Sequence, residues 1–461
     1  MKYQSYVLVT LMCFTLFACD DLVEVNVPND RITSETVFSK DETANSAVVG
    51  IYNQLFQATF SSGGQTSVTV LAGLSADNLQ ATVSTTNLLE FEENEIFNNN
   101  SYNLGIWSSA YNTIYMTNAV LDGIDNNTAI SAELKAELSG EARFLRAFTY
   151  FYLVNLYGDV PLVLSTDYQN NAVVSRTDTT QVFNQIVEDL ESAINLLGTT
   201  YENGERLRAN SYTATALLAR VHLYLENWEM AEQLSTSVID ASGIFELLPL
   251  NEVFLANSRE AIWQISPIAG GLATTNTNEG ALFIMQNTRG NIALTENFMA
   301  SIDTLDTRRD NWIGSFDSET NKYYFPYKYK VKNSTEDASE YSMVMRLAEQ
   351  YLIRAEARLK QGKIMESIED LDRIRLRAGL KPIAEINPET TSEELLDLIL
   401  LERRRELFGE WGHRWLDLKR TGRAKVNLPP LKPLWEDTDV FYPIPEDELR
   451  KNLNLTQNPG Y

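Results

Sequence analysis

The sequence predicts a mainly α-helical protein in which pairs of helices pack together and long loops are inserted between them. Three observations in the 461 residues predict this class. Two segments have apolar residues at helical spacing, two further segments resemble one another, and two long stretches are rich in Ser, Thr, Asn and Gly. Hydrophobic residues make up 44% of the chain, as is usual in globular proteins. We expect regions 19–240 and 241–461 to be interwoven into one body.

The clearest helical patterns cover residues 141–156 and 180–197. In both segments, apolar side chains recur three or four positions apart, so that they share one face of a helix. Gly158 and Pro161 follow the first segment, and these residue types are typical of the end of a helix. We therefore expect two amphipathic helices in the N-terminal region.

Two related segments begin at Ala219 (ARVHLYLENWEMAEQLSTSVI) and at Ala355 (AEARLKQGKIMESIEDLDRIR). When they are aligned, Ala231 corresponds to Ser367, and small residues at such a position let two helix backbones approach closely. The pattern resembles the tetratricopeptide helix pair. The copies start 136 residues apart and do not form a tandem array. We therefore expect helix pairs that pack together, with long loops inserted between them.

Residues 58–103 and 267–335 show no regular periodicity and are rich in Ser, Thr, Asn and Gly. Loops of this length inside a compact fold are usually functional or disordered. The second stretch also contains Trp312, Tyr323 and Tyr324, and aromatic residues are depleted in disordered segments. We expect both stretches to be irregular, and the second to be ordered.

Residues 1–18 have the layout of a secretory signal, with Lys2 followed by a short apolar run and a small residue before Cys19. The leucine three positions before that cysteine makes the leader resemble a bacterial lipoprotein signal. On this interpretation Cys13 is removed with the leader, and Cys19 becomes the lipid-bearing first residue. The alternative is a soluble exported protein with an unused thiol.

Net charge and hydropathy limit the partners that the mature protein can bind and the ways in which it can associate with a membrane. The chain has 38 basic residues, one of them Lys2 in the leader, and 63 acidic residues, so the mature net charge is −26. Such a chain is repelled by nucleic-acid phosphates, and we expect no nucleic-acid partner. No later stretch approaches the 18 to 20 apolar residues of a membrane-spanning helix. Asp20 and Asp21 resemble the surface-export signal of Bacteroidetes lipoproteins.

Several blocks together resemble the SusD/RagB family of outer-membrane nutrient-binding lipoproteins of Bacteroidetes. They run in the family's order from the leader to Tyr461: EARFLRAFTYFYLVNLYGDVPLV, RLAEQYLIRAEARL, RLRAGL, LLERRRELFGEWGHRWLDLKR and YPIPEDELRKNLNLTQNPGY. The resemblance implies a SusD-like fold, with tetratricopeptide-like helix pairs supporting a looped ligand face. It also implies a surface-exposed protein of the outer membrane, held there by lipid at Cys19.

The resemblance implies a function as well. Family members capture a nutrient, usually a glycan, and act as the lid of a SusC-like TonB-dependent transporter without cleaving the ligand. A peptide ligand, as in the RagB branch, is the alternative, and a helix-pair scaffold that holds a partner helix is another. The family blocks are chiefly scaffold, so the sequence names neither the glycan nor its linkage.

Candidate ligand contacts combine flat apolar faces for sugar C–H groups with polar groups for hydroxyls. Trp312, Tyr323 and Tyr324 lie in the second irregular stretch, where loops on a rigid scaffold often carry binding residues. Arg289, in NTRGN, is suited to a bidentate hydrogen bond to sugar hydroxyls. The competing interpretations are that the aromatic residues pack the loop onto the body and that the arginine forms an ion pair.

Two further candidates come from the first irregular stretch. Asp77 and Asn78, in LSADNLQ, lie where members of the family often place polar groups near the ligand. Helix capping is the competing role for both residues. Phe91, Phe97 and Tyr102 are weaker candidates from the same stretch.

An enzyme is disfavoured. A glycosidase needs two carboxylates on one sugar, roughly 5 to 10 Å apart. Glu402, Glu406 and Glu410 are spaced to share a helix face. The neighbouring arginines are placed to pair with them, and the block is scaffold in the family; these are Arg403, Arg404, Arg405 and Arg414.

His222 and His413 are the only histidines, which argues against a His-rich metal site. We expect no catalytic residue and no cofactor, and leave an all-oxygen calcium site open.

Overall fold

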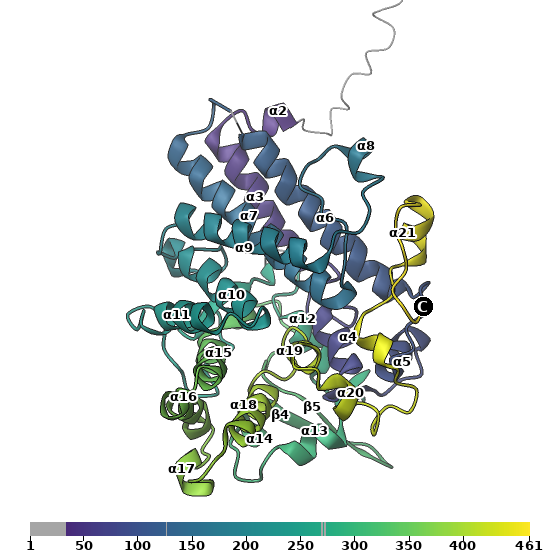
Figure 1. Cartoon of the computed structure of the whole chain (residues 1–461), viewed down its shortest axis with the longest axis vertical. Helices are drawn as coiled ribbons and strands as arrows, with labels where there is room; N and C mark the ends of the chain where they lie inside the picture. The colour runs from purple at the N-terminus through teal and green to yellow at the C-terminus, as the bar shows by residue number, and fades with distance from the viewer. Residues whose placement is uncertain (1–33, 126, 269–270, 272) are drawn as a thin grey trace, which may run out of the picture.

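The computed structural model describes residues 34–125, 127–268, 271 and 273–461 (Figure 1). The leader and Cys19 lie outside these residues. The chain is mostly helical, which confirms the predicted class. Within the described residues no helix combines the length and the apolar character that crossing a bilayer requires.

The N-terminal region contributes a layer of long helices, drawn at the top of Figure 1. The helices of this region are α2 (Ser34–Val37), α3 (Asp41–Leu55), α4 (Val68–Ser75), α5 (Thr86–Glu93), α6 (Ser101–Ile124), α7 (Ala132–Tyr157), α8 (Tyr168–Asn171), α9 (Thr179–Leu196), α10 (Ser211–Tyr224) and α11 (Trp228–Ile239). The two predicted amphipathic helices are found in α7 and α9. Gly158 ends α7 with a φ of 72°, a conformation that glycine adopts readily. Asp178 caps the start of α9, where its side chain accepts from the backbone N–H of Thr180.

The C-terminal region has shorter helices, and its strands all lie within residues 261–346. Its helices are α12 (Asn278–Phe283), α13 (Glu296–Ser301), α14 (Arg308–Trp312), α15 (Leu347–Lys360), α16 (Ile364–Arg377), α17 (Ile383–Ile386), α18 (Ser392–Glu406), α19 (His413–Arg420), α20 (Ala424–Asn427) and α21 (Glu446–Lys451). The two related sequence segments form the helix pairs α10–α11 and α15–α16. The pairs pack on each other through α11 and α15, and Ala219 and Ala231 are buried with Ile353 and Ala357 at this contact. The predicted packing of separated helix pairs is confirmed.

In the described part of the chain, six short strands form two antiparallel sheets. They are β1 (Leu79–Ala81), β2 (Ala261–Ile265), β3 (Ile292–Leu294), β4 (Ile313–Asp317), β5 (Lys322–Pro326) and β6 (Ser342–Arg346). One sheet has the order β1-β3-β5-β4, and the other pairs β2 with β6. In the larger sheet Leu294 is opposite both Leu79 and Tyr324. This sheet joins the two stretches predicted to be irregular, which instead contain short strands and helices.

An aromatic cluster connects the two halves of the chain. Trp263 of β2 packs edge-on against Phe144 and Phe148 of α7, with ring centroids 5.0 and 4.9 Å away. Phe148 also contacts Trp411, which follows α18, at 5.2 Å. Edge-to-face packing of this kind adds to the stabilisation from buried area. The shared core supports the proposal that regions 19–240 and 241–461 are interwoven into one body.

Candidate ligand-binding site

The larger sheet borders a surface pocket of about 580 Å³. The hairpin of β4 and β5 forms one side, and β1 and α13 contribute the other. Its polar lining consists of Gln80, Glu296, Thr320, Asn321, Lys322, Tyr323 and Tyr324. The structure therefore brings residues of both stretches predicted to form the ligand face to one place.

Tyr323, which lines this pocket, lies beside Arg289. Arg289 donates from Nη1 to the hydroxyl of Tyr323 at 3.2 Å, and its Cζ lies 5.5 Å from the centre of that ring. Asn321 donates to the same hydroxyl at 3.4 Å. The hydrogen bonds from Asn321 and Arg289 lower the pKa of Tyr323. No carboxylate of the described residues forms an ion pair with Arg289, so the predicted loop ion pair is not seen.

Tyr324 lies on the other side of the same strand. It is half-buried and packs against the main core, whereas Tyr323 packs against a separate cluster that contains Phe325. This difference follows from the strand, since successive side chains point to opposite faces. The ammonium of Lys322 lies 5.6 Å from the ring centre of Tyr324. Each tyrosine thus has a cationic side chain beside its ring.

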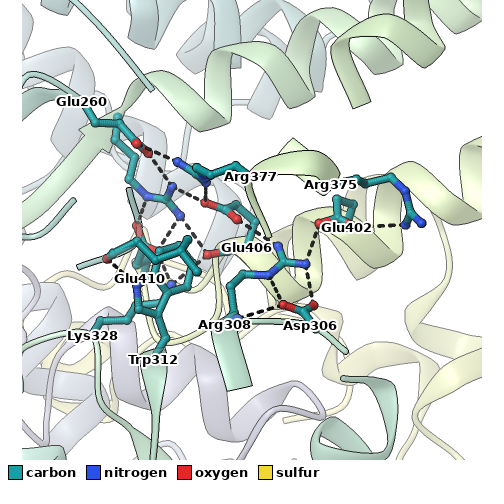
Figure 2. A network of polar contacts seen from close by, with 12 residues as sticks. Glu260, Asp306, Arg308, Trp312, Lys328, Arg375, Arg377, Glu402, Glu406 and Glu410 are labelled. Carbon is teal, nitrogen blue, oxygen red and sulfur yellow. Dashed lines mark hydrogen bonds and ion pairs between the residues drawn. The ribbon is translucent and has the colours of Figure 1, made fainter. Parts of the chain in front are cut away.

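The structure corrects the prediction for Trp312. Its side chain is 0% exposed, and its Nε1 donates to the backbone oxygen of Leu250 at 2.9 Å. The ammonium of Lys328 lies 4.7 Å from the ring centre (Figure 2). The backbone oxygen of Trp312 accepts from Tyr327 at 2.7 Å. Because no part of the ring is exposed, Trp312 offers no face to a ligand and instead anchors the base of the β4–β5 hairpin.

Asp77 and Asn78 are also placed in the interior, which corrects their prediction as ligand contacts. The carboxylate of Asp77 accepts two hydrogen bonds of 2.8 Å from Arg414, and Arg404 donates to Asn78 at 2.8 Å. Burial alone would raise the pKa of Asp77, but the hydrogen bond from Arg414 and the charges of Arg404 and Arg414 outweigh it and lower the pKa. The backbone oxygens of both residues accept from Thr295, which ties β1 to the segment after β3. The two side chains therefore hold the segment before β1 against α18 and α19.

Two known protein families match parts of the chain. A family described as "Starch-binding associating with outer membrane" matches residues 26–223, and the SusD family matches residues 313–433. The chain belongs to the SusD/RagB family. The resemblance predicted from the sequence blocks is confirmed.

Individual SusD-like proteins are also similar to the chain in sequence or in structure. SusD-like protein P25 of Formosa agariphila is 26% identical over an alignment of 544 positions, which covers 100% of both chains. A crystal structure of a SusD superfamily protein from Bacteroides vulgatus has a TM-score of 0.79 and 21% identity, and covers 92% of this chain and 99% of that one. A laminarin-binding SusD-like protein has a TM-score of 0.77 and 22% identity, with 92% and 100% covered. The structural likeness shows that the fold is SusD-like.

Three glutamates, which we call the glutamate ladder, lie inside a buried charge network (Figure 2). They are Glu402 and Glu406 of α18 and Glu410, which follows this helix. Glu406 accepts from Arg308 at 2.9 Å and also pairs with Arg346 and Arg377. Burial would raise the pKa of Glu406, but these three guanidinium groups outweigh it and hold the pKa well below its usual range. A covered, ionised carboxylate of this kind is not placed to donate a proton to a substrate. The described residues also contain no cluster of acidic, His or Cys side chains suited to a metal ion.

The partners of the ladder differ from the local pairing predicted for it. Of the arginines near the ladder in sequence, Arg403 donates to Asp417 at 2.8 Å, and Arg404 and Arg414 bind the Asp77 region. The ladder is instead paired with basic residues from β6, α14, α16 and the segment after β5. The predicted helix face is also shorter than expected, because α18 ends at Glu406 and Glu410 lies after it. Sequence spacing does not show which distant elements cover such a face.

Three amide side chains at the face were missed by the sequence analysis. Gln80 lines the pocket, and its Nε2 donates to the backbone oxygen of Leu294 at 3.1 Å. Gln65 accepts from Asn291 at 2.6 Å and donates to Tyr102, one of the weaker candidates, at 3.4 Å. These residues lie in irregular segments that carry no periodic signal. The only available indication was that amides accompany the aromatic residues of the same stretches.

Proposed function

We propose that this protein is a cell-surface lipoprotein that captures a glycan and delivers it to a SusC-like TonB-dependent transporter, for which it acts as the lid. The observation that carries the proposal is the pocket of about 580 Å³ with Tyr323 and Tyr324 in its wall and Arg289 hydrogen-bonded to Tyr323. Capture occurs without cleavage of the ligand.

The chemistry of this face suits a sugar chain. Aromatic rings offer flat apolar surfaces for the C–H faces of pyranose rings. Arg289, Gln80 and Asn321 supply donors and acceptors for hydroxyl groups, and a few such polar groups in a concave site provide specificity. The starch-binding description of the family and the laminarin-binding relative of the same fold support this ligand class.

The anchor and the transporter partner complete the proposal. Cys19 carries the lipid, and this residue and the leader lie outside the described part of the chain. The description of the matching family refers to the outer membrane, which supports this location. A lipid-anchored protein with a surface-exposed ligand face is placed to hold a sugar chain at the mouth of a barrel.

Calorimetric titration tests the function. The mature chain with Cys19→Ala is titrated with a panel of soluble neutral polysaccharides and with a tryptic peptide mixture. We expect heat from one class of glycan and a loss of at least tenfold in affinity in Tyr323→Ala. Tyr168→Ala is the control, because this tyrosine is 76% exposed on α8.

Two outcomes contradict the proposal. Heat from peptides alone would identify a peptide-binding protein of the RagB type. Equal loss of affinity in Tyr323→Ala and Tyr168→Ala would show that the β4–β5 hairpin is not the binding site.

A further inference from the structure

A second pocket, of about 360 Å³, lies apart from the face described above. It is formed between the end of α5 and the C-terminal segment that contains a short 3-10 helix, Asp437–Val440. Its lining includes Asn94, Glu95, Phe97, Glu436, Asp439 and Tyr461. The pocket is close to the edge of the ligand face, because Glu92, two residues before Asn94, accepts from the backbone N–H of Ala81 in β1 at 2.8 Å.

The wall of this pocket contains a buried donor without a partner. Asn94 is 2% exposed, and its Oδ1 accepts from the ammonium of Lys432 at 2.7 Å. The same nitrogen of Lys432 also donates to the backbone oxygens of Leu74 and Ser75, so its three hydrogens match three acceptors. The amide therefore turns its oxygen to Lys432, and its Nδ2 is the remaining group. Within the described residues neither this Nδ2 nor the hydroxyl of Tyr461 has a hydrogen-bond partner. A buried donor of this kind calls for an acceptor on a ligand.

The same pocket presents acceptors. Asp439 is buried, and its Oδ2 accepts from the backbone N–H of Glu436 at 2.6 Å. Burial and the neighbouring charges of Glu95, Glu436 and Asp437 raise the pKa of Asp439 to about 6. No described lysine or arginine forms an ion pair with Glu95, Glu436 or Asp439. The pocket therefore repels anions and offers carboxylate oxygens to a ligand that donates hydrogen bonds.

Phe97 adds a flat apolar surface at the rim. Its side chain is 59% exposed, an unusual position for a phenylalanine. The backbone beneath it is held in place, since the N–H of Phe97 donates to Glu90 at 3.2 Å and Asn100 donates to the same carboxylate oxygen at 2.6 Å. The ring is thus presented from a rigid turn beside the polar groups.

Two classes of ligand can be compared with the polar groups and the ring of this pocket. A basic side chain of a protein would satisfy the carboxylates, but it has no acceptor for the amide of Asn94. A neutral sugar donates to carboxylates, accepts from an amide and stacks its C–H face on a ring. We propose that this pocket binds a neutral sugar unit and forms a second glycan subsite beside the face that contains Tyr323. This inference rests on the proposed glycan-binding function.

A thiol-protection experiment locates the ligand directly. Cys13 and Cys19 are the only cysteines, so the mature chain with Cys19→Ala is free of thiols. Asn98→Cys, at a residue that lines the pocket, and Leu453→Cys, at a residue 90% exposed elsewhere, are each modified with a thiol reagent. The probes are neutral laminari- and malto-oligosaccharides. We expect the sugar that binds to slow modification at least threefold at Asn98→Cys and not at Leu453→Cys.

Calorimetry of two further variants complements this measurement. Phe97→Ala and Asp439→Asn are each expected to lower the affinity for that oligosaccharide three- to tenfold. An unchanged modification rate and unchanged affinities, together with weaker binding by Tyr323→Ala, would overturn the second subsite and leave the proposed function intact. Protection by an arginine-containing peptide in place of a sugar would also overturn it. Absence of any glycan binding would instead refute the proposed function.

Discussion

Glu406 offers a sharp test of the buried charge network that supports the ligand face. Its carboxylate accepts from Arg308 at 2.9 Å and from Arg346 at 2.5 Å, and it also pairs with Arg377 (Figure 2). The substitution Glu406→Gln keeps the volume of the side chain and removes its charge. We expect a large loss of stability, because three guanidinium groups share this carboxylate.

The magnitude follows from the balance of charges in the network. The network joins basic side chains from several elements to buried carboxylates: Arg308, Lys328, Arg346, Arg375 and Arg377 pair with Glu260, Asp306, Glu402, Glu406 and Glu410, and Arg375 also pairs with Asp372. Glu406→Gln removes one negative charge from this buried network and leaves the guanidinium groups of Arg308, Arg346 and Arg377 without the carboxylate that they share. Removing one partner from a buried ion pair costs about 3–5 kcal/mol. We expect the free energy of unfolding to fall by that amount.

Urea unfolding measures this change, and Glu446→Gln is the matched control. Glu446 pairs with Arg450 on the exposed surface of α21, where loss of the pair should cost less than about 0.5 kcal/mol. The pKa of Glu406 is lowered from 4.5, so its contribution is complete above about pH 5 and is lost as the pH falls below 4.5. A destabilisation by Glu406→Gln that is no larger than that of the control would refute the reasoning.

Three other substitutions test separate parts of the structure. Trp312→Ala should lower the free energy of unfolding by about 3–5 kcal/mol in urea, whereas unchanged stability with lost glycan binding would restore its ligand role. Gly63→Ala should cost about 1 kcal/mol or more, because φ is +73° and an added Cβ would lie 2.2 Å from Cδ of Glu279; an unchanged melting temperature would contradict this. Burial lowers the pKa of Lys419 from 10.5 to about 7, so the unfolded chain binds more protons above pH 7. From pH 7 to 9, wild-type stability should therefore rise relative to Lys419→Met, and parallel pH profiles would contradict it.

The helices were predictable because their signal is local. Residues 141–156 and 180–197 carry the periodicity of one buried face, and the structure places them in α7 and α9. The helix pairs that begin at Ala219 and Ala355 were recognisable by their likeness to one another. The four-stranded sheet was not predictable, since β1 and β3 have three residues each and are more than 200 positions apart.

The ligand face was predictable only in part. Tyr323 and Arg289 were predicted from the same irregular stretch, and the structure brings them together. Trp312 was misassigned because the groups that cover it, such as Leu250, come from other parts of the chain. Asp77 was misassigned for the same reason, since its partner Arg414 is 337 positions away. Composition indicates that a segment contains aromatic and polar groups, but tertiary contacts decide which of them remain exposed.

The most direct test of the glycan-binding face is a crystal structure of the mature chain with an oligosaccharide identified by calorimetry. We predict that a sugar ring lies in the pocket of about 580 Å³, stacked on Tyr323, with a hydroxyl group within hydrogen-bond distance of Arg289. Oligosaccharide bound at a site that excludes both Tyr323 and Tyr324 would contradict the assignment of this face.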